Sequence, residues 1–321
     1  MVGPGDIIGD YVIEALIGEG ANATVYRARH PDGRKFALKF LSRSDDDTRL
    51  RMEREARVLR ELRHDNIVGL EETLTWRELP VLVMAFVDGP DLGQWLDTEG
   101  APTLAEALAL VSEICRGLAH AHRNGAIHRD LKPDNVLLAV TDGALTPRLA
   151  DFGLAKVTGD GNPGALVTQR GSILGTGGYM SPEQMVDAAS VDHRSDLYSL
   201  GCLFYRILCG RPPFDQGDFR SQFSAMSTAG FPPPEELAPG MPDELYALLR
   251  GLLEIDRDDR PQTAEEVLAA LEAIPLTRAD PTAPMAVESA GGLLLWGGRA
   301  FIALPVAAAA VAASVVLLSG G

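Results

Sequence analysis

The pattern of hydrophobic and polar positions divides the chain into two parts of different texture. Up to about residue 90, short runs of β-branched and apolar residues alternate with glycine and proline turns, which predicts strands. The clearest expected strands are 11–17, 24–29, 35–41 and 80–87. Apolar residues at 52, 56 and 59, preceded by an acidic first turn, predict one helix among them. The first part is therefore expected to be a small sheet with one helix.

From residue 91 to 274 the apolar positions recur at helical spacing instead. The expected helices are 104–124, one within 191–209, 243–253 and 263–274. Residues 151–183 are rich in Gly, Thr and Ser and have little periodicity. A long aperiodic loop inside a compact domain is typical of a functional segment.

The C-terminal part has a third texture. Residues 275–292 contain Pro, Ala, Thr and Gly without an apolar face, which predicts a linker. Residues 300–318 contain no charged side chain and, as a helix, would span roughly the 30 Å of a bilayer core. Trp296 and Arg299 stand where an interfacial anchor belongs. We expect a single membrane-spanning helix; the alternative is an apolar tail packed on the folded domain or on a partner.

Composition narrows the function classes. Twenty-nine basic residues against 45 acidic ones give a net charge of −16, which argues against nucleic-acid binding. The three cysteines form neither a disulfide framework nor a metal box, so we expect buried small hydrophobic side chains. Lysine occurs only at positions 35, 39, 132 and 156, while arginine serves elsewhere. A retained lysine therefore suggests a need for a compact point charge.

Two segments carry candidate chemistry. Residues 18–25 (GEGANATV) join two expected strands, and their glycines allow backbone N–H groups to approach phosphates. Because this loop connects strand to strand, it does not fit a dinucleotide-binding turn, which would open a helix. Residues 128–135 (HRDLKPDN) place a carboxylate, an ammonium and an amide on one tight loop. Residues 151–153 (DFG) add a second carboxylate at the start of the long aperiodic loop.

With these motifs in this order, the chain resembles the protein kinases, and most closely the bacterial Hanks-type serine/threonine kinases, over residues 11–274. The resemblance implies an α+β bilobal fold, with a small β-rich N-lobe and a larger helical C-lobe. It also implies ATP as a substrate and Mg²⁺, with Mn²⁺ as an alternative, as the metal. Phosphoryl transfer needs mainly positioning and charge neutralisation, which these residue types supply.

The resemblance implies a role for each motif residue. Lys39 would hold the α- and β-phosphates and pair with Glu55. Asp130 would accept or orient the proton of the substrate hydroxyl, and Lys132 would neutralise the γ-phosphate. The expected metal ligands are Asn135 and Asp151.

The nucleotide pocket is also implied by the resemblance. Met84 would be the gatekeeper, and residues 85–87 would form the hinge that reads adenine through backbone groups. The expected ATP-binding residues are Ile17, Gly18, Glu19, Gly20, Ala23, Val25, Ala37, Lys39, Met84, Phe86, Val87 and Leu137. Ala23 stands in place of the third loop glycine, and Ala85 where this subfamily usually has glutamate, and we expect both departures to have small effects.

Further positions concern specificity and regulation. Lys132 and the ending 179–183 (YMSPE) resemble serine/threonine rather than tyrosine kinases. Glu183 would pair with Arg260, and Asp196 would brace the backbone of the catalytic loop. Arg129 would bind a phosphate on the activation segment, 151–183. The candidate phosphosites and regulatory positions are Thr168, Ser172 and Thr176, with Thr168 at the family spacing; the alternative is that Thr168 is an ordinary exposed threonine.

The expected organisation follows. The segments are a lead-in at 1–10, an N-lobe at 11–87, a C-lobe at 88–275, a linker at 276–298, a spanning helix at 299–318 and an external tail at 319–321. Such a protein would lie in the cytoplasmic membrane as a single-pass kinase facing the cytoplasm, would act on Ser and Thr of proteins, and would form a homodimer for trans-autophosphorylation. The alternatives are a membrane-tethered pseudokinase scaffold and a kinase-fold phosphotransferase for small molecules.

Overall fold

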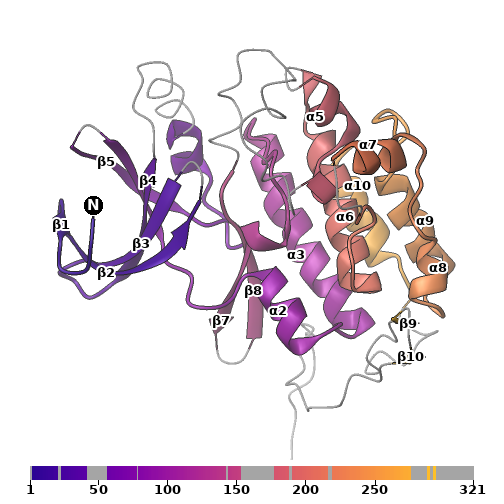
Figure 1. Ribbon diagram of the computed structural model, residues 1–321, viewed down its shortest axis with the longest axis horizontal. Coiled ribbons are helices and arrows are strands. Elements are labelled where there is room, and N and C mark those ends of the chain that lie inside the picture. The colour runs from indigo at the N-terminus through magenta and orange to yellow at the C-terminus, as the bar shows by residue number, and fades with distance from the viewer. Residues whose placement is uncertain are drawn as a thin grey trace, which may run out of the picture.

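A computed structural model shows two lobes joined side by side, one built on a sheet and one on helices (Figure 1). It describes residues 2–20, 23–41, 56–77, 79–141, 144–152, 177–187, 190–215, 219–275, 288–289 and 292–293. This arrangement is the predicted bilobal α+β fold.

The sheet lobe is a six-stranded antiparallel sheet in the order β1-β2-β3-β4-β6-β5. Its strands are β1 (Ile7–Ile8), β2 (Tyr11–Glu19), β3 (Ala23–Arg29), β4 (Lys35–Leu41), β5 (Leu70–Trp76) and β6 (Leu79–Ala85). Strand β4 alternates strictly: Phe36, Leu38 and Phe40 are buried in the core of the lobe. Because successive strand side chains point to opposite faces, Ala37 and Lys39 point to the other face of the sheet.

The sheet begins earlier than the sequence pattern indicated. Residues 1–10 are predicted to be a lead-in, but Ile7 and Ile8 pair with Val12 and Tyr11 as an added edge strand. The Ile8 side chain is only 1% exposed. A strand of two residues is too short to show a period, so only its packing reveals it.

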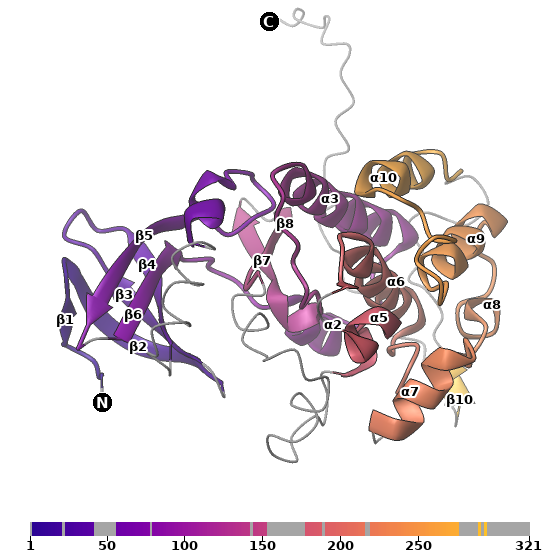
Figure 2. The ribbon, with the colours of Figure 1, turned by 90° about the horizontal axis from the view of Figure 1, so that it is seen from above.

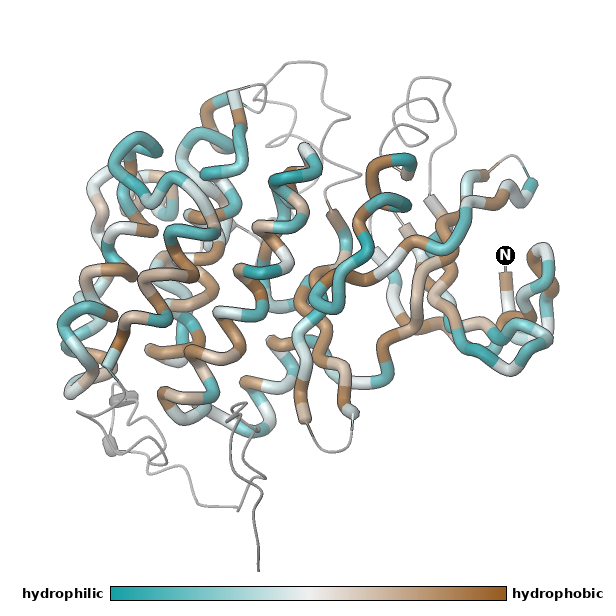
Figure 3. The backbone as a smooth tube through the Cα atoms, turned by 180° about the vertical axis from the view of Figure 1, so that it is seen from behind, coloured by the Kyte–Doolittle hydropathy of each residue, from teal (hydrophilic) through white to brown (hydrophobic). Residues whose placement is uncertain are grey.

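The helical lobe is organised around α3 and α6, which lie at its centre (Figure 2). Its helices are α2 (Leu92–Glu99), α3 (Leu104–Arg123), α5 (Pro182–Val186), α6 (Arg194–Cys209), α7 (Phe219–Ser227), α8 (Pro234–Leu237), α9 (Asp243–Leu252) and α10 (Ala264–Glu272). Every residue of α6 except its two arginines is buried, which marks a helix inside the core rather than on its surface. In Figure 3 the apolar, brown positions of the helices gather toward the interior of this lobe.

A hairpin between the lobes carries the candidate chemistry. It consists of a short 3₁₀ helix (Pro133–Asn135) followed by β7 (Val136–Thr141) and β8 (Ala144–Leu149). Val68 N–H donates to Leu149 O at 2.9 Å, which ties the hairpin to the sheet lobe. Leu138 N–H donates to Pro90 O at 2.9 Å, which ties it to the segment that connects the lobes.

The four helices predicted for the helical lobe are confirmed with small shifts at their ends, and α3 begins with a capping box formed by Thr103 and Glu106. The start of the helix predicted for the sheet lobe lies outside the described residues. Cys115, Cys202 and Cys209 are all free and buried, as expected. Within the described parts of the chain, no helix combines the length and the apolarity needed to cross a membrane. The expected spanning helix at 299–318 lies outside the described residues.

Candidate active site

The catalytic loop, residues 128–135, brings three polar side chains together between α3 and β7. Asn135 Nδ2 donates to the carboxylate of Asp130 at 2.9 Å and to its backbone oxygen at 2.7 Å. Lys132 Nζ lies 3.5 Å from Asp130 Oδ2. The Asp130 carboxylate is therefore held between an amide and an ammonium group, and about a fifth of its side chain stays exposed.

Lys39 joins the sheet lobe to this hairpin. Its ammonium lies 2.8 Å from Asp151 Oδ1, and the lysine side chain is 12% exposed against 39% for the aspartate. Asp151 follows β8 with φ +56°, in the left-handed region that costs a non-glycine residue roughly 1–2 kcal/mol. An uncommon backbone conformation at a partly exposed charged residue is typical of functional sites.

A buried carboxylate anchors the backbone of the loop. Asp196, on α6, is fully buried and accepts the N–H groups of His128 and Arg129, each at 2.8 Å. His122 Nε2 donates to the same carboxylate at 2.8 Å. Burial alone would raise the pKa of Asp196, but these hydrogen bonds and the nearby imidazoles bring the pKa below its ordinary value. The carboxylate is thus ionised, and the expected contact between Asp196 and the loop is present.

His128 links the loop to the start of the activation segment. Its Nδ1 accepts the Asp130 N–H at 3.3 Å, so the ring proton is on Nε2, which donates to Ala150 O at 2.9 Å. Burial lowers the pKa of His128, which keeps the imidazole neutral. The ring also stacks at 4.6 Å from Phe152. The His128 side chain therefore contacts both the backbone of Asp130 and the two residues that flank Asp151.

The end of the activation segment is fixed by a bidentate ion pair. Arg260 donates from Nη1 and Nη2 to the two Glu183 oxygens at 2.8 and 2.9 Å, and Ser195 Oγ donates to Oε1 at 2.6 Å. Burial would raise the pKa of Glu183, yet the hydrogen bonds from Arg260 and Ser195 bring it below its usual value. The Arg260 guanidinium also lies 4.9 Å from the ring centre of Tyr198. The predicted pairing of Glu183 with Arg260 is confirmed.

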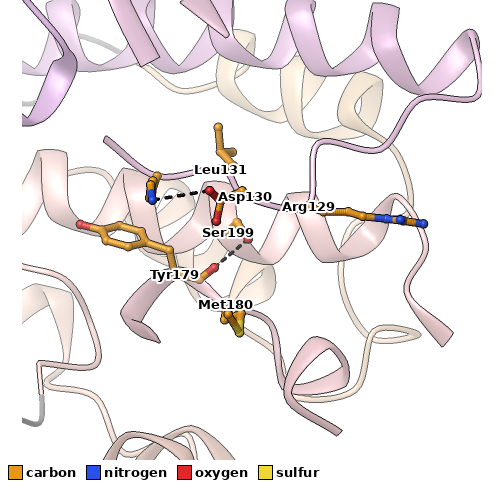
Figure 4. Close-up of a pocket in the computed structure, with 7 residues that line it drawn as sticks. Arg129, Asp130, Leu131, Tyr179, Met180 and Ser199 are labelled. Carbon is orange, nitrogen blue, oxygen red and sulfur yellow. Dashed lines mark hydrogen bonds and ion pairs between the residues drawn. The ribbon is translucent and has the colours of Figure 1, made fainter. Parts of the chain in front are cut away.

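A pocket lies beside Asp130, between the catalytic loop and the end of the activation segment. Its lining residues are Arg129, Asp130, Leu131, Lys132, Tyr179, Met180 and Ser199. Ser199 Oγ donates to Tyr179 O at 2.7 Å, which fixes the wall formed by the segment. In Figure 4 the Arg129 side chain points away from Asp130, whereas Tyr179 and Met180 lie beside Asp130 at the pocket.

The sheet brings the expected nucleotide residues to one place. Across β3, β4 and β6, Val25 lies opposite Lys39, and Ala37 lies opposite Met84. The two strands of the glycine hairpin pair Gly18 with Val25 and Glu19 with Thr24, and Gly20 N–H closes it by donating to Ala23 O at 2.9 Å.

The floor of this region is apolar. Val68, Val87 and Ala150 form a small buried cluster on which Met84 and Leu137 pack. Ile17 is 46% exposed on the strand above it. Phe86 instead lies on the cationic side of the linker that connects the two lobes, with its ring centre 5.6 Å from Lys35 Nζ. The binding of adenine by the backbone of 85–87 stays a prediction.

Some expected residues cannot be placed. Glu55, Gly153, Thr168, Ser172 and Thr176 lie outside the described residues. Two other residues at the site were not singled out from the sequence. His122 supports Asp196 from 74 positions away in the chain, and no local pattern encodes such a contact. Gln184 contacts the catalytic loop, and a signal for it existed, because Ser181 and Gln184 have the spacing of a capping box.

The donor set fits a hard divalent cation. The Asn135 amide and the Asp151 carboxylate offer oxygen ligands, which Mg²⁺ and Mn²⁺ prefer. Among the described residues, no group of three or more His, Cys, Asp or Glu side chains is arranged to hold a metal. A site with so few protein ligands is typical of Mg²⁺ bound together with substrate phosphates rather than in an all-protein cage.

Known proteins place the chain in a family. The family model for the protein kinase domain matches residues 11–270. The chain is 35% identical over 280 residues to serine/threonine-protein kinase PkaA of Streptomyces coelicolor, covering 82% of this chain and 50% of that protein. It is also 35% identical to PknB of Mycobacterium tuberculosis, covering 84% of this chain and 44% of PknB. The chain thus spans about half the length of the curated relatives it matches.

A comparison of folds agrees. The crystal structure of the PknI kinase domain of Mycobacterium tuberculosis superposes with a TM-score of 0.65 at 27% identity, covering 85% of this chain and 99% of that one. Residues 11–270, which the family model matches, contain both lobes and the interlobe hairpin. The chain belongs to the protein kinase domain family.

Proposed function

We propose that this chain is an ATP- and Mg²⁺-dependent serine/threonine protein kinase. The observation that carries the proposal is the loop on which Asn135 and Lys132 hold the Asp130 carboxylate, opposite the ion pair of Lys39 and Asp151. All of these groups belong to elements fixed by buried contacts, which is the preorganisation that phosphoryl transfer needs. Intact charged groups at each of these positions argue against a pseudokinase scaffold.

Each residue has a role that its position supports. Asp130, partly exposed at the pocket, would orient the acceptor hydroxyl and receive its proton. Lys132, on the same loop, would balance charge on the transferred phosphoryl group, and Lys39 would bind the α- and β-phosphates. Asn135 and Asp151 would hold Mg²⁺, which neutralises phosphate charge. Glu55 is proposed as the partner of Lys39 in the active state.

The preference for Ser and Thr rests on Lys132 and on the relatives, whose names describe serine/threonine kinases. A protein acceptor is favoured over a small molecule because the end of the activation segment, which a polypeptide would contact, lines the pocket beside Asp130. Protein substrates carrying Ser or Thr are therefore proposed as the acceptors.

Regulation by the activation segment is part of the proposal. Arg129 precedes Asp130, and its side chain points away from Asp130 (Figure 4). A phosphate on the activation segment would pair with its guanidinium group. We place that phosphate on Thr168, with Ser172 as the second candidate, added in trans by another copy of the chain. A further proposal is that residues 299–318 anchor the protein in the cytoplasmic membrane with the kinase domain in the cytoplasm.

The test uses the full chain in detergent or vesicles, with radiolabelled ATP and Mg²⁺. Wild-type protein is expected to label itself on Ser or Thr, and Asp130→Asn to lose at least about 100-fold of this activity while retaining nucleotide binding. Absence of label from the wild type, with ATP bound, would refute the kinase proposal. Full activity of Thr168→Ala would refute the regulatory part, and recovery of the expressed protein in the soluble fraction would refute the anchor.

A further inference from the structure

Ser181 and Gln184 form a buried hydrogen-bonded unit at the start of α5. Gln184 Oε1 accepts both the N–H and the Oγ–H of Ser181, at 3.0 and 3.2 Å, and Ser181 Oγ accepts the Gln184 N–H at 3.4 Å. Ser181 is completely buried and Gln184 is 8% exposed. Because the amide oxygen already receives two donors, the NH₂ group of Gln184 has a fixed direction.

That NH₂ group reaches the catalytic loop. Gln184 Nε2 donates to the backbone carbonyl of Arg129 at 2.8 Å, across 55 positions of the chain. Arg129 has φ +62°, a left-handed conformation that is unfavourable for a non-glycine residue and must be held by its surroundings. Asp196 holds its N–H, and Gln184 holds its carbonyl.

The peptide group between Arg129 and Asp130 is therefore fixed at both ends. Its carbonyl accepts from Gln184, and its N–H donates to His128 Nδ1 at 3.3 Å. A peptide group is planar, so holding both ends sets the direction in which the Asp130 Cα presents its carboxylate. Asn135 completes the arrangement by donating to the next carbonyl, at 2.7 Å.

We propose that Gln184, oriented by Ser181, is a positioning residue that makes the end of the activation segment and the catalytic loop one mechanical unit. Tyr179 and Met180, directly before Ser181, line the same pocket as Asp130 (Figure 4). A shift of this segment moves the Arg129 carbonyl and turns the Asp130 carboxylate. The state of the activation segment is thus transmitted to Asp130 through one buried amide. This inference rests on the proposed kinase function.

The first test replaces the amide without changing the length of the side chain. In the full-length protein, Gln184→Met leaves the Arg129 carbonyl without this donor, and Gln94→Met at an exposed position of α2 is the matched control. A lost buried hydrogen bond corresponds to about a 10-fold fall in kcat, with the KM for ATP changed less than about twofold. Backbone hydrogen exchange at 128–131 is expected to accelerate in Gln184→Met and not in the control. Unchanged kcat or unchanged exchange would overturn the proposal.

The second test separates a hydrogen bond from a packing role. In Gln184→Glu, a protonated carboxyl group can donate to the Arg129 carbonyl, but a carboxylate repels it. The activity of this variant relative to wild type at the same pH is expected to rise as the pH falls from 8 to 6. A flat ratio would exclude the hydrogen-bond mechanism. If wild type transfers no phosphate, the kinase proposal fails, and the exchange data alone decide whether Gln184 holds the loop.

Discussion

Lys39 and Asp151 form an ion pair of 2.8 Å that links β4 of the sheet lobe to the second residue after β8 of the interlobe hairpin. The pair thus joins an expected nucleotide residue to the hairpin that follows the catalytic loop. It also places a cation and a carboxylate where phosphate and metal charges would be balanced. The lobes are therefore coupled through the groups proposed to handle the nucleotide.

Replacing Lys39 with Met is expected to lower phosphoryl transfer at least about 100-fold, because the side chain retains its length but the phosphates and Asp151 lose their cation. Lys35→Met is the matched control, since Lys35 is on the same face of β4 but pairs with Asp88, whose side chain is 79% exposed. Label transfer from ATP measures both variants. Equal losses in the two variants would show that charge on this strand, and not the position of Lys39, matters.

Arg260→Met is expected to destabilise the protein by about 3–5 kcal/mol, because it leaves the Glu183 carboxylate without its cation in a buried place. Arg123→Met removes a surface ion pair, in which the Arg123 side chain is 63% exposed and that of Glu265 46%. This change should lower the free energy of unfolding by less than about 1 kcal/mol. Urea unfolding measures both. A loss below about 1 kcal/mol for Arg260→Met would mean that Glu183 finds another partner or becomes protonated.

The stability of the protein is expected to fall as the pH drops below 6.5, the ordinary pKa of histidine. Burial lowers the pKa of His128 in the folded state, and burial and then His120 lower that of His64. In this range the unfolded chain binds more protons than the folded one, so the free energy of unfolding decreases with falling pH. The His128 contribution is fully present above 6.5 and is lost between 6.5 and its folded-state pKa.

The His128 contribution can be isolated by comparing slopes rather than absolute stabilities. In His128→Phe the ring is retained but cannot take up a proton, so the fall between pH 7 and pH 5 should be shallower than in wild type. Urea titrations at several pH values measure this. Parallel curves for the two proteins would contradict the assignment of a low pKa to His128.

Gly89→Ala is expected to push the linker that connects the two lobes away from the interlobe hairpin of β7 and β8. A Cβ at this position would lie 1.9 Å from Leu138 O, a backbone atom that cannot move aside alone. Overpacking of this kind costs about 1–3 kcal/mol or more, and nucleotide affinity should fall as the linker shifts. Gly69→Ala is the control, because nothing lies within 4 Å of its Cβ. Thermal unfolding and binding of a fluorescent ADP analogue report the two effects, and equal behaviour of both variants would contradict this packing.

The features that residues near one another in the chain determine can be predicted from the sequence. These features are the strands, the helices and the short motifs that carry reactive groups. The alternation in β4 predicts a buried face with Phe36 and an opposite face with Lys39, because strand geometry alone divides them. The segments containing Asp130, Asn135 and Asp151 were identified for the same reason: the residues of each motif lie within a few positions of one another.

The contacts that hold these groups in place come from residues far apart in the chain. The contacts from Asp196 and Gln184 to the catalytic loop join positions 55 to 68 apart, and no local period can encode them. The pairing of β1 likewise became visible only through the burial of Ile8. Short motifs in the sequence identify which groups react. The direction of a carboxylate depends instead on buried hydrogen bonds, whose partners are brought together only when distant helices pack.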